Sequence, residues 1–162
     1  MDNSSSRSSF VLYLTMFTAL VLQVFPLPLW AHQARPDFAL LVLIYWSMAL
    51  PNRIAIFAAV IVGVLSDALT ASLLGQHVLA YAIAVYIVLI LHKRLRLLPM
   101  WQQAITVLSL LYVERVIAAL VLGITEGKLP NMQFWLPPVV GMLLWPWIFL
   151  LLRAIRQRYR IQ

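Results

Sequence analysis

Six long runs of apolar residues follow one another along the chain, and short polar segments separate them. An α-helix of about 20 apolar residues is long enough to cross the hydrocarbon core of a bilayer. The runs are residues 10–25, 37–50, 54–74, 77–91, 101–123 and 134–152. The pattern therefore predicts an all-α integral membrane protein, a six-helix transmembrane bundle over residues 10–152 between two short tails, 1–9 and 153–162.

The run over residues 37–50 is short for a simple span. At 1.5 Å per residue its helix is only about 21 Å long, whereas the hydrocarbon core of a bilayer is about 30 Å thick. Three arrangements fit this length: a span that includes flanking residues, local thinning of the bilayer, and a segment that enters the membrane and returns. The sequence leaves all three open.

Composition agrees with a membrane protein, since 64% of the residues are hydrophobic and only 10% are charged. A soluble domain carries about 25% charged residues. The spans use most of the 162 residues, so no soluble catalytic or ligand-binding domain is predicted. The absence of cysteine excludes disulfides, thiolate metal sites and cysteine nucleophiles. The net charge of +7 lies at the ends of apolar runs, which predicts membrane lipids as partners and no nucleic acid.

The positions of Lys and Arg predict the orientation in the membrane. With six spans and a cytoplasmic N-terminus, only Arg35 and Lys128 fall in outside loops, and Arg115 lies within a run. The basic residues on the cytoplasmic side are Arg7, Arg53, Lys93, Arg94, Arg96, Arg153, Arg156, Arg158 and Arg160. This asymmetry predicts that both termini are cytoplasmic. Because Arg7 alone holds the N-terminus inside, a five-span arrangement with one end outside stays open as an alternative.

A ladder of small residues spaced by four runs through the third apolar segment. Its positions are Ala55, Ala59, Gly63, Asp67, Ala71 and Gly75. Small residues let two helix backbones come close, which predicts a helix-packing or interaction face. Positions four apart drift by about 40° per step around a helix, so the ladder suits a partner helix that crosses this one.

Charged residues within the apolar runs are the second unusual feature. Asp67 lies near the middle of its run, and Glu114 and Arg115 lie near the middle of theirs. A central Asp costs roughly 2.5–3.5 kcal/mol on insertion scales, so it should face protein, water or a positive partner. Counted from the predicted cytoplasmic ends, Asp67 and Arg115 are both about 20 Å deep, which allows an ion pair between them. We interpret such a pair as a structural fastener rather than as part of a proton or substrate relay.

The polar residues show no catalytic or metal-binding pattern. The histidines His32, His77 and His92 all lie at predicted span ends, and no two of them have the i, i+4 spacing of helical metal ligands. The serines within the runs have no His or Lys at a spacing that would supply a base. The sequence therefore predicts no catalytic residue, no metal site and no cofactor.

Several motifs resemble, in the same order, those of the bacterial rod shape-determining protein D family, MreD. They are Arg35-Pro36-Asp37, Leu50-Pro51-Asn52-Arg53, Gly63 with Asp67 and Gly75, Trp101-Gln102-Gln103, and Leu144-Trp145-Pro146-Trp147 followed by Arg153 and Arg156. The resemblance covers nearly the whole chain. Arg115 does not map onto the family pattern.

The resemblance implies a non-enzymatic inner-membrane scaffold of the rod, or elongation, complex that builds lateral-wall peptidoglycan. It implies as partners an MreC-type bitopic membrane protein and, through it, a penicillin-binding transpeptidase, a SEDS-type glycan polymerase and actin-like filaments. It also implies a fold similar to the substrate-binding component of energy-coupling vitamin transporters. The alternative is a small-molecule-binding membrane transport component. That alternative requires a polar pocket open to the outside, and the predicted outside loops are poor in groups that bind ligands.

Overall fold

The structure, a computed structural model, describes residues 3–26, 28, 34–51, 56–128 and 130–159, and residues 3–9 by their backbone alone. These residues form six α-helices and one short 3₁₀ helix, with no strand among them. The elements are α1 (Asn3–Val24), α3 (Phe38–Ala49), α4 (Ile56–Thr70), α5 (Gln76–Leu95), α6 (Met100–Glu126), η1 (Met132–Trp135) and α7 (Leu136–Arg158). The predicted all-α class is confirmed.

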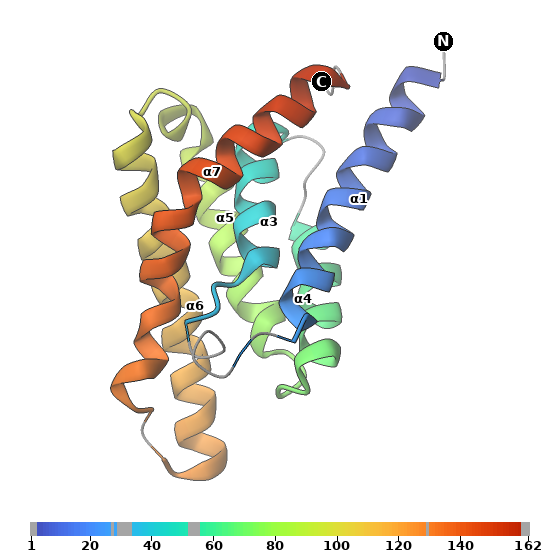
Figure 1. Cartoon of the computed structure of the whole chain (residues 1–162). Helices are drawn as coiled ribbons and strands as arrows, with labels where there is room; N and C mark the ends of the chain where they lie inside the picture. The colour runs from blue at the N-terminus through green and yellow to red at the C-terminus, as the bar shows by residue number, and fades with distance from the viewer. Residues whose placement is uncertain (1–2, 27, 29–33, 52–55, 129, 160–162) are drawn as a thin grey trace.

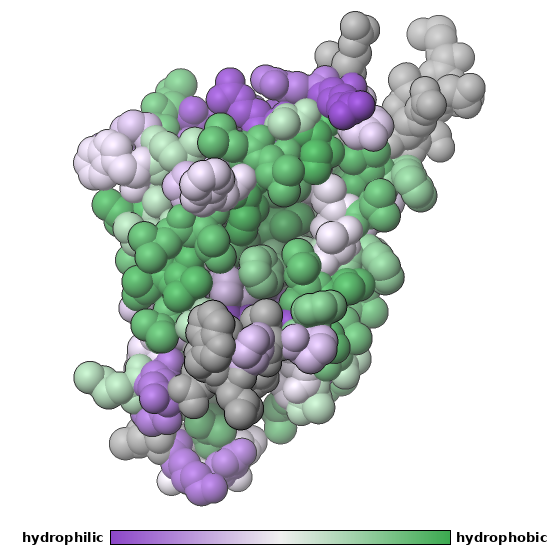
Figure 2. Space-filling model, in the orientation of Figure 1, coloured by the Kyte–Doolittle hydropathy of each residue, from purple (hydrophilic) through white to green (hydrophobic). Residues whose placement is uncertain are grey.

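The helices have the composition of membrane-spanning segments. Within the described residues, three segments are both long and apolar enough to cross a bilayer: Gln76–Leu95, Met100–Glu126 and Met132–Arg158. Shorter apolar helices cover Phe10–Val24, Phe38–Ala49 and Ile56–Thr70. Figure 2 shows hydrophilic residues gathered at the two ends of the visible face and a broad hydrophobic band between them.

The helices run up and down in one bundle, so that α1 begins and α7 ends at the same end (Figure 1). We call this the basic end, because the arginines of the last turns of α7 lie there. The turn between α4 and α5 and the connection between α6 and α7 lie at the opposite end, which we call the turn end (Figure 1). Helix α3 stands at the centre and contacts every other described α-helix.

Helix α3 is enclosed by protein. All of its residues from Ala39 to Ala49 are buried, and the indole Nε1 of fully buried Trp46 donates to Thr15 Oγ1 of α1 at 2.9 Å. At the turn end Asp37 Oδ1 accepts from the backbone N–H of Leu40 at 2.9 Å and caps the helix. At the basic end Arg96 donates to the carbonyl oxygens of Met48 and Ala49, at 2.6 and 2.8 Å. Because neighbouring helices surround α3, its length need not match the bilayer.

Helix α4 is shorter than the apolar run predicts, since it ends at Thr70 rather than continuing to Leu74. Ala71 follows with a positive φ of 51°, and Gly75 precedes α5 with a φ of 103°. Both residues therefore lie in the turn and not on a helical ladder. Ala59 and Gly63 are buried on α4, whereas Ala55 lies outside the described residues.

Gly63 lies at a close approach between α4 and the start of α5. A Cβ atom placed on Gly63 would be 2.6 Å from Val78 Cα and 2.8 Å from Val78 N. Backbone atoms cannot move aside as a flexible side chain can, so only glycine fits at this crossing. The contact fixes the start of α5, and with it the position of His77, against α4.

Candidate functional site

A cavity of about 920 Å³ opens at the turn end of the bundle. The end of α1, the segment before α3, the α4–α5 turn, the second half of α6 and the start of α7 form its walls. Its polar and charged lining residues are Gln23, Arg35, Asp37, Thr70, Ser72, Gln76, His77, Glu114, Arg115, Thr125, Glu126, Asn131 and Gln133. Most of these side chains come from helices rather than loops. The prediction that few ligand-binding groups are available considered only the loops, whereas helices supply most of the polar side chains at this end.

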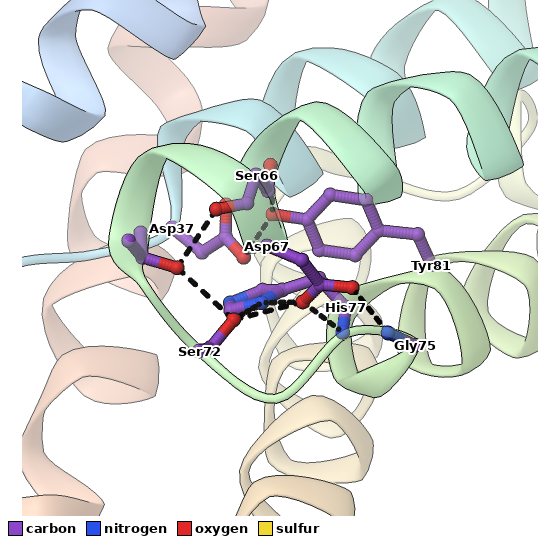
Figure 3. Close-up of polar contacts among 8 residues, drawn as sticks. Asp37, Ser66, Asp67, Ser72, Gly75, His77 and Tyr81 are labelled. Carbon is purple, nitrogen blue, oxygen red and sulfur yellow. Dashed lines mark hydrogen bonds and ion pairs between the residues drawn. The ribbon is translucent and has the colours of Figure 1, made fainter.

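Asp67 organises the turn between α4 and α5, and its carboxylate is almost fully buried, with 1% of the residue exposed. Its Oδ1 accepts from Ser72 Oγ and from the backbone N–H of His77, both at 2.9 Å, and its Oδ2 accepts from Gly75 N at 2.7 Å (Figure 3). A buried carboxylate is stable only when such donors replace water. The side chain thus determines the path of the turn.

His77 is held by the same carboxylate. Its Nδ1 lies 2.7 Å from Asp67 Oδ1 (Figure 3). A carboxylate oxygen only accepts hydrogen bonds, so the proton of the neutral ring lies on Nδ1 and the lone pair lies on Nε2. Asp67 therefore fixes both the orientation and the tautomer of His77.

Asp37 has a second buried partner besides the backbone of α3. The Tyr81 hydroxyl donates to Asp37 Oδ2 at 2.6 Å and lies 3.2 Å from Ser66 Oγ (Figure 3). Tyr81 is fully buried on α5, and Ser66 is fully buried on α4. These contacts join α3, α4 and α5 just beneath the cavity.

Arg35 connects the segment before α3 to the end of α1. Its guanidinium donates to the carbonyl oxygen of Phe25 at 2.7 Å and also to that of Leu22. These carbonyls belong to the last turn of a helix, where a cation is favoured. Desolvation lowers the pKa of the Arg35 guanidinium from its ordinary value, yet this group stays protonated at neutral pH.

The predicted ion pair between Asp67 and Arg115 is wrong. Arg115 Nε lies 3.3 Å from Glu114 Oε2, and the guanidinium lies over the Phe134 ring, 5.0 Å from its centroid. Asp67 lies in the last turn of α4 rather than at mid-span, and the α4–α5 turn already satisfies its carboxylate. The equal depths predicted for Asp67 and Arg115 depend on both apolar runs being helical throughout, and α4 ends at Thr70.

Three buried groups that can ligate a metal converge at the inner wall of the cavity. Asp37, His77 and Glu114 each offer one ligand atom, and the three atoms lie within 4.8 Å of one another. The residues come from the segment before α3, the start of α5 and the middle of α6. No local spacing connects them, so a search for helical ligand pairs missed them. The available signal was that each is an isolated polar residue in or beside an apolar run.

Comparison with known proteins identifies the family. The family model described as rod shape-determining protein MreD matches residues 5–155. A rod shape-determining protein MreD of Haemophilus influenzae is 32% identical over 143 residues, which cover 88% of this chain and 88% of that protein. The chain belongs to the MreD family. Membership assigns it a role in cell shape within the rod-shape system, and MreD is not a known enzyme family.

No solved structure matches the chain. The similarity to the substrate-binding component of vitamin transporters therefore stays a prediction.

The residues that carried the MreD resemblance lie at both ends of the bundle. Arg35, Pro36 and Asp37 lie beside the cavity at the turn end. Trp145 is fully buried within α7, whereas the neighbouring Trp147 is 75% exposed. Among the other motif residues, Pro146 lies inside α7, Pro51 follows α3, and Arg53 lies outside the described residues. Most of these residues shape helix ends and helix contacts, and only the first group reaches the cavity.

Proposed function

We propose that this chain is a non-enzymatic scaffold of the rod complex in the bacterial inner membrane. In this role it helps to assemble and regulate the synthesis of lateral-wall peptidoglycan. The observation that carries the proposal is the MreD family match over residues 5–155. Its proposed direct partner is an MreC-type bitopic protein, which connects it to a penicillin-binding transpeptidase, a SEDS-type polymerase and actin-like filaments. In this proposal both termini are cytoplasmic and the cavity opens to the outside.

The shape of the bundle supports contacts within the membrane. Turns between described helices are short, since α5 ends at Leu95 and α6 begins at Met100. Little of the described chain projects beyond the helices, so partners must be recognised chiefly by helix faces and short turns.

Helix α1 presents a face that suits a single partner helix. It contacts only α3 and α4 among the described elements. Its outer face carries large apolar side chains at alternating spacings of four and three, the spacing by which two helices pack along a seam. They are Phe10, Leu14, Phe17 and Val21, with exposed fractions of 66, 48, 64 and 48%. We assign this face to the transmembrane helix of the MreC-type partner.

Photo-crosslinking in cells tests this assignment. A photoreactive residue at Phe17 is expected to capture the MreC-type protein. The control is Ile90, which is similarly exposed at 63% but lies on α5, a helix that does not contact α1 within the described residues. Equal capture from both positions would remove the assignment to α1. If the chain also fails to restore rod shape in cells depleted of their own MreD, and recovers no wall-synthesis protein in mild detergent, the scaffold proposal itself is wrong.

The cavity favours a second candidate, a small-molecule-binding component. Its volume of about 920 Å³ falls within the range of ligand pockets, which is about 300–1,000 Å³. A bulky residue in the cavity distinguishes the two functions: Val121→Trp fills it, whereas Leu120→Trp adds the same bulk at the neighbouring, 60% exposed position. A pure scaffold tolerates both changes. Loss of rod shape with Val121→Trp alone, while partners still co-purify, would favour ligand binding.

A further inference from the structure

The cluster of Asp37, His77 and Glu114 is more deeply buried than an ordinary polar pocket lining. The exposed fractions of Asp37, His77 and Glu114 are only 6, 8 and 4%, respectively. Their ligand atoms lie within 4.8 Å of one another, whereas donors around one zinc ion, at about 2.0–2.2 Å from the metal, are roughly 3–3.5 Å apart. A contraction of about an ångström would bring the three atoms to a bound ion. Side-chain rotation about existing bonds is sufficient for a change of this size.

Asp67 prepares His77 as a metal ligand through a hydrogen bond to its ring. Asp67 Oδ1 accepts from Nδ1 at 2.7 Å, which leaves the Nε2 lone pair available. A carboxylate that holds one nitrogen of a histidine while the other binds metal is a common arrangement, because it orients the ring and increases its basicity. Asp67 is itself held by Ser72 and by the backbone of the turn. It is therefore a positioning residue for His77.

Glu114 supplies an observation independent of His77. Only 4% of the residue is exposed, and no hydrogen bond to its carboxylate is found among the described residues. Arg115 Nε lies 3.3 Å from Glu114 Oε2 and makes no hydrogen bond. Gln23 Oε1 is likewise buried and without a hydrogen bond at the wall of the same cavity. A bound ion is one of the usual partners of such buried polar groups.

The charges point to a divalent cation. Asp37 and Glu114 approach each other in a buried site, where like charges disfavour double ionisation unless a positive charge lies between them. Arg115 offsets part of this charge, since its Nε lies 3.3 Å from Glu114 Oε2, but its guanidinium lies over the Phe134 ring. Arg35 donates to α1 carbonyls, and no positively charged group other than Arg115 contacts the carboxylates of Asp37 and Glu114 among the described residues. A mixed set of one imidazole nitrogen and two carboxylate oxygens suits zinc, and such ligands suit magnesium or calcium less well.

We propose that Asp37, His77 and Glu114 bind one divalent transition-metal ion, with zinc as the occupant. The ion joins α5 and α6 to the capped start of α3. Three protein ligands leave a fourth position, which faces the cavity and accepts water or an anionic group. This inference goes beyond the scaffold role and does not depend on it, because it concerns an ion within the chain.

Zinc titration of the purified full-length chain tests the proposal. The protein in detergent is stripped with a chelator and titrated calorimetrically against zinc in the presence of a competing chelator. We expect one zinc ion per chain and a higher thermal unfolding midpoint in the bound state. Glu114→Gln, which keeps the shape of the side chain, should weaken binding by at least about tenfold, and Asp67→Asn by about 10–100-fold.

Glu126→Gln is the matched control. It makes the same chemical change at an exposed residue of the same cavity, one that contacts Lys128 at 3.6 Å and lies outside the cluster. Binding should be unchanged in this variant. Zinc binding that is absent, that involves several weak sites, or that Glu114→Gln leaves unchanged would overturn the proposal.

Cobalt keeps the test decisive if the variants fold poorly. The wild-type chain loaded with Co²⁺ should develop visible absorption bands typical of a low-coordinate nitrogen and oxygen site, and one equivalent of zinc should remove them. A spectrum no different from that of Co²⁺ in buffer would overturn the proposal on the wild-type protein alone.

Discussion

The basic end and the turn end of the bundle are both polar, but their charges are arranged differently. At the basic end Arg96, Arg153 and Arg156 line a cavity of about 300 Å³. At the turn end acidic, basic and imidazole groups line one of about 920 Å³. Arg153 is exposed at the surface, whereas Asp67, the residue that organises the turn, is 1% exposed and accepts several hydrogen bonds. At the basic end, we expect the positive charge of Arg153 to matter. At the turn end, we expect the geometry of the hydrogen bonds to Asp67 to matter.

The largest effect is expected from Asp67→Asn. One oxygen becomes an NH₂ group that faces a backbone N–H, so at least one hydrogen bond to a charged acceptor is lost. The expected loss of stability is about 1.5–3 kcal/mol per bond, measured by thermal or denaturant unfolding in detergent. Glu126→Gln, at the exposed rim of the same cavity, should change stability by less than about 0.5 kcal/mol. Equal effects of the two changes would show that the hydrogen bonds of Asp67 do not hold the α4–α5 turn.

Gly63→Ala should be nearly as damaging. The added Cβ would lie 2.6 Å from Val78 Cα, so the α4–α5 crossing must open, at a cost of about 1–3 kcal/mol. Gly123→Ala is the control, because nothing lies within 4 Å of a Cβ at that helical position. The control should stabilise the protein by up to about 1 kcal/mol, since Ala is the better helix former. Identical unfolding midpoints would mean that the crossing is not tight.

A smaller effect is expected at the basic end from Arg96→Met. This change removes the donors to Met48 O and Ala49 O and leaves the last turn of α3 without its cap. The expected loss is about 0.5–1.5 kcal/mol per hydrogen bond, read from the same unfolding experiment. Arg94→Met, at an exposed neighbouring position, should cost less. If both variants unfold alike, the charge at position 96 matters and its hydrogen bonds do not.

The smallest effect is expected from Arg153, where only charge should count. In reconstituted vesicles, Arg153→Gln should reduce the preference for anionic over neutral lipid by about 1 kcal/mol, and Arg153→Lys should leave it unchanged. Quenching of tryptophan fluorescence by brominated lipids measures this preference. A lysine variant that behaves like the glutamine variant would show that geometry matters at the basic end too.

Sequence patterns predicted the helices well and the site poorly, for identifiable reasons. Apolar runs determine which segments become helices, and each of the six predicted runs overlaps one of the described α-helices. The end of α4 was missed because residues 71–74 remain largely apolar. A carboxylate at Asp67, rather than a loss of hydropathy, specifies the turn.

The convergence of Asp37, His77 and Glu114 was beyond local patterns. The three residues lie in separate segments, and only the packing of α5 and α6 around α3 brings them together. The Asp67–Arg115 pair failed for a related reason, since depth along a helix does not tell which way a side chain points.

The scaffold account is tested most directly in cells depleted of their own MreD protein. This chain and its Asp67→Asn, Gly63→Ala and Glu126→Gln variants are expressed, and cell shape and recovery of the MreC-type partner are measured from the same cultures. The account predicts that both quantities fall together in the first two variants and remain intact in the third. Cells that stay rod-shaped with a variant that recovers no partner would contradict it.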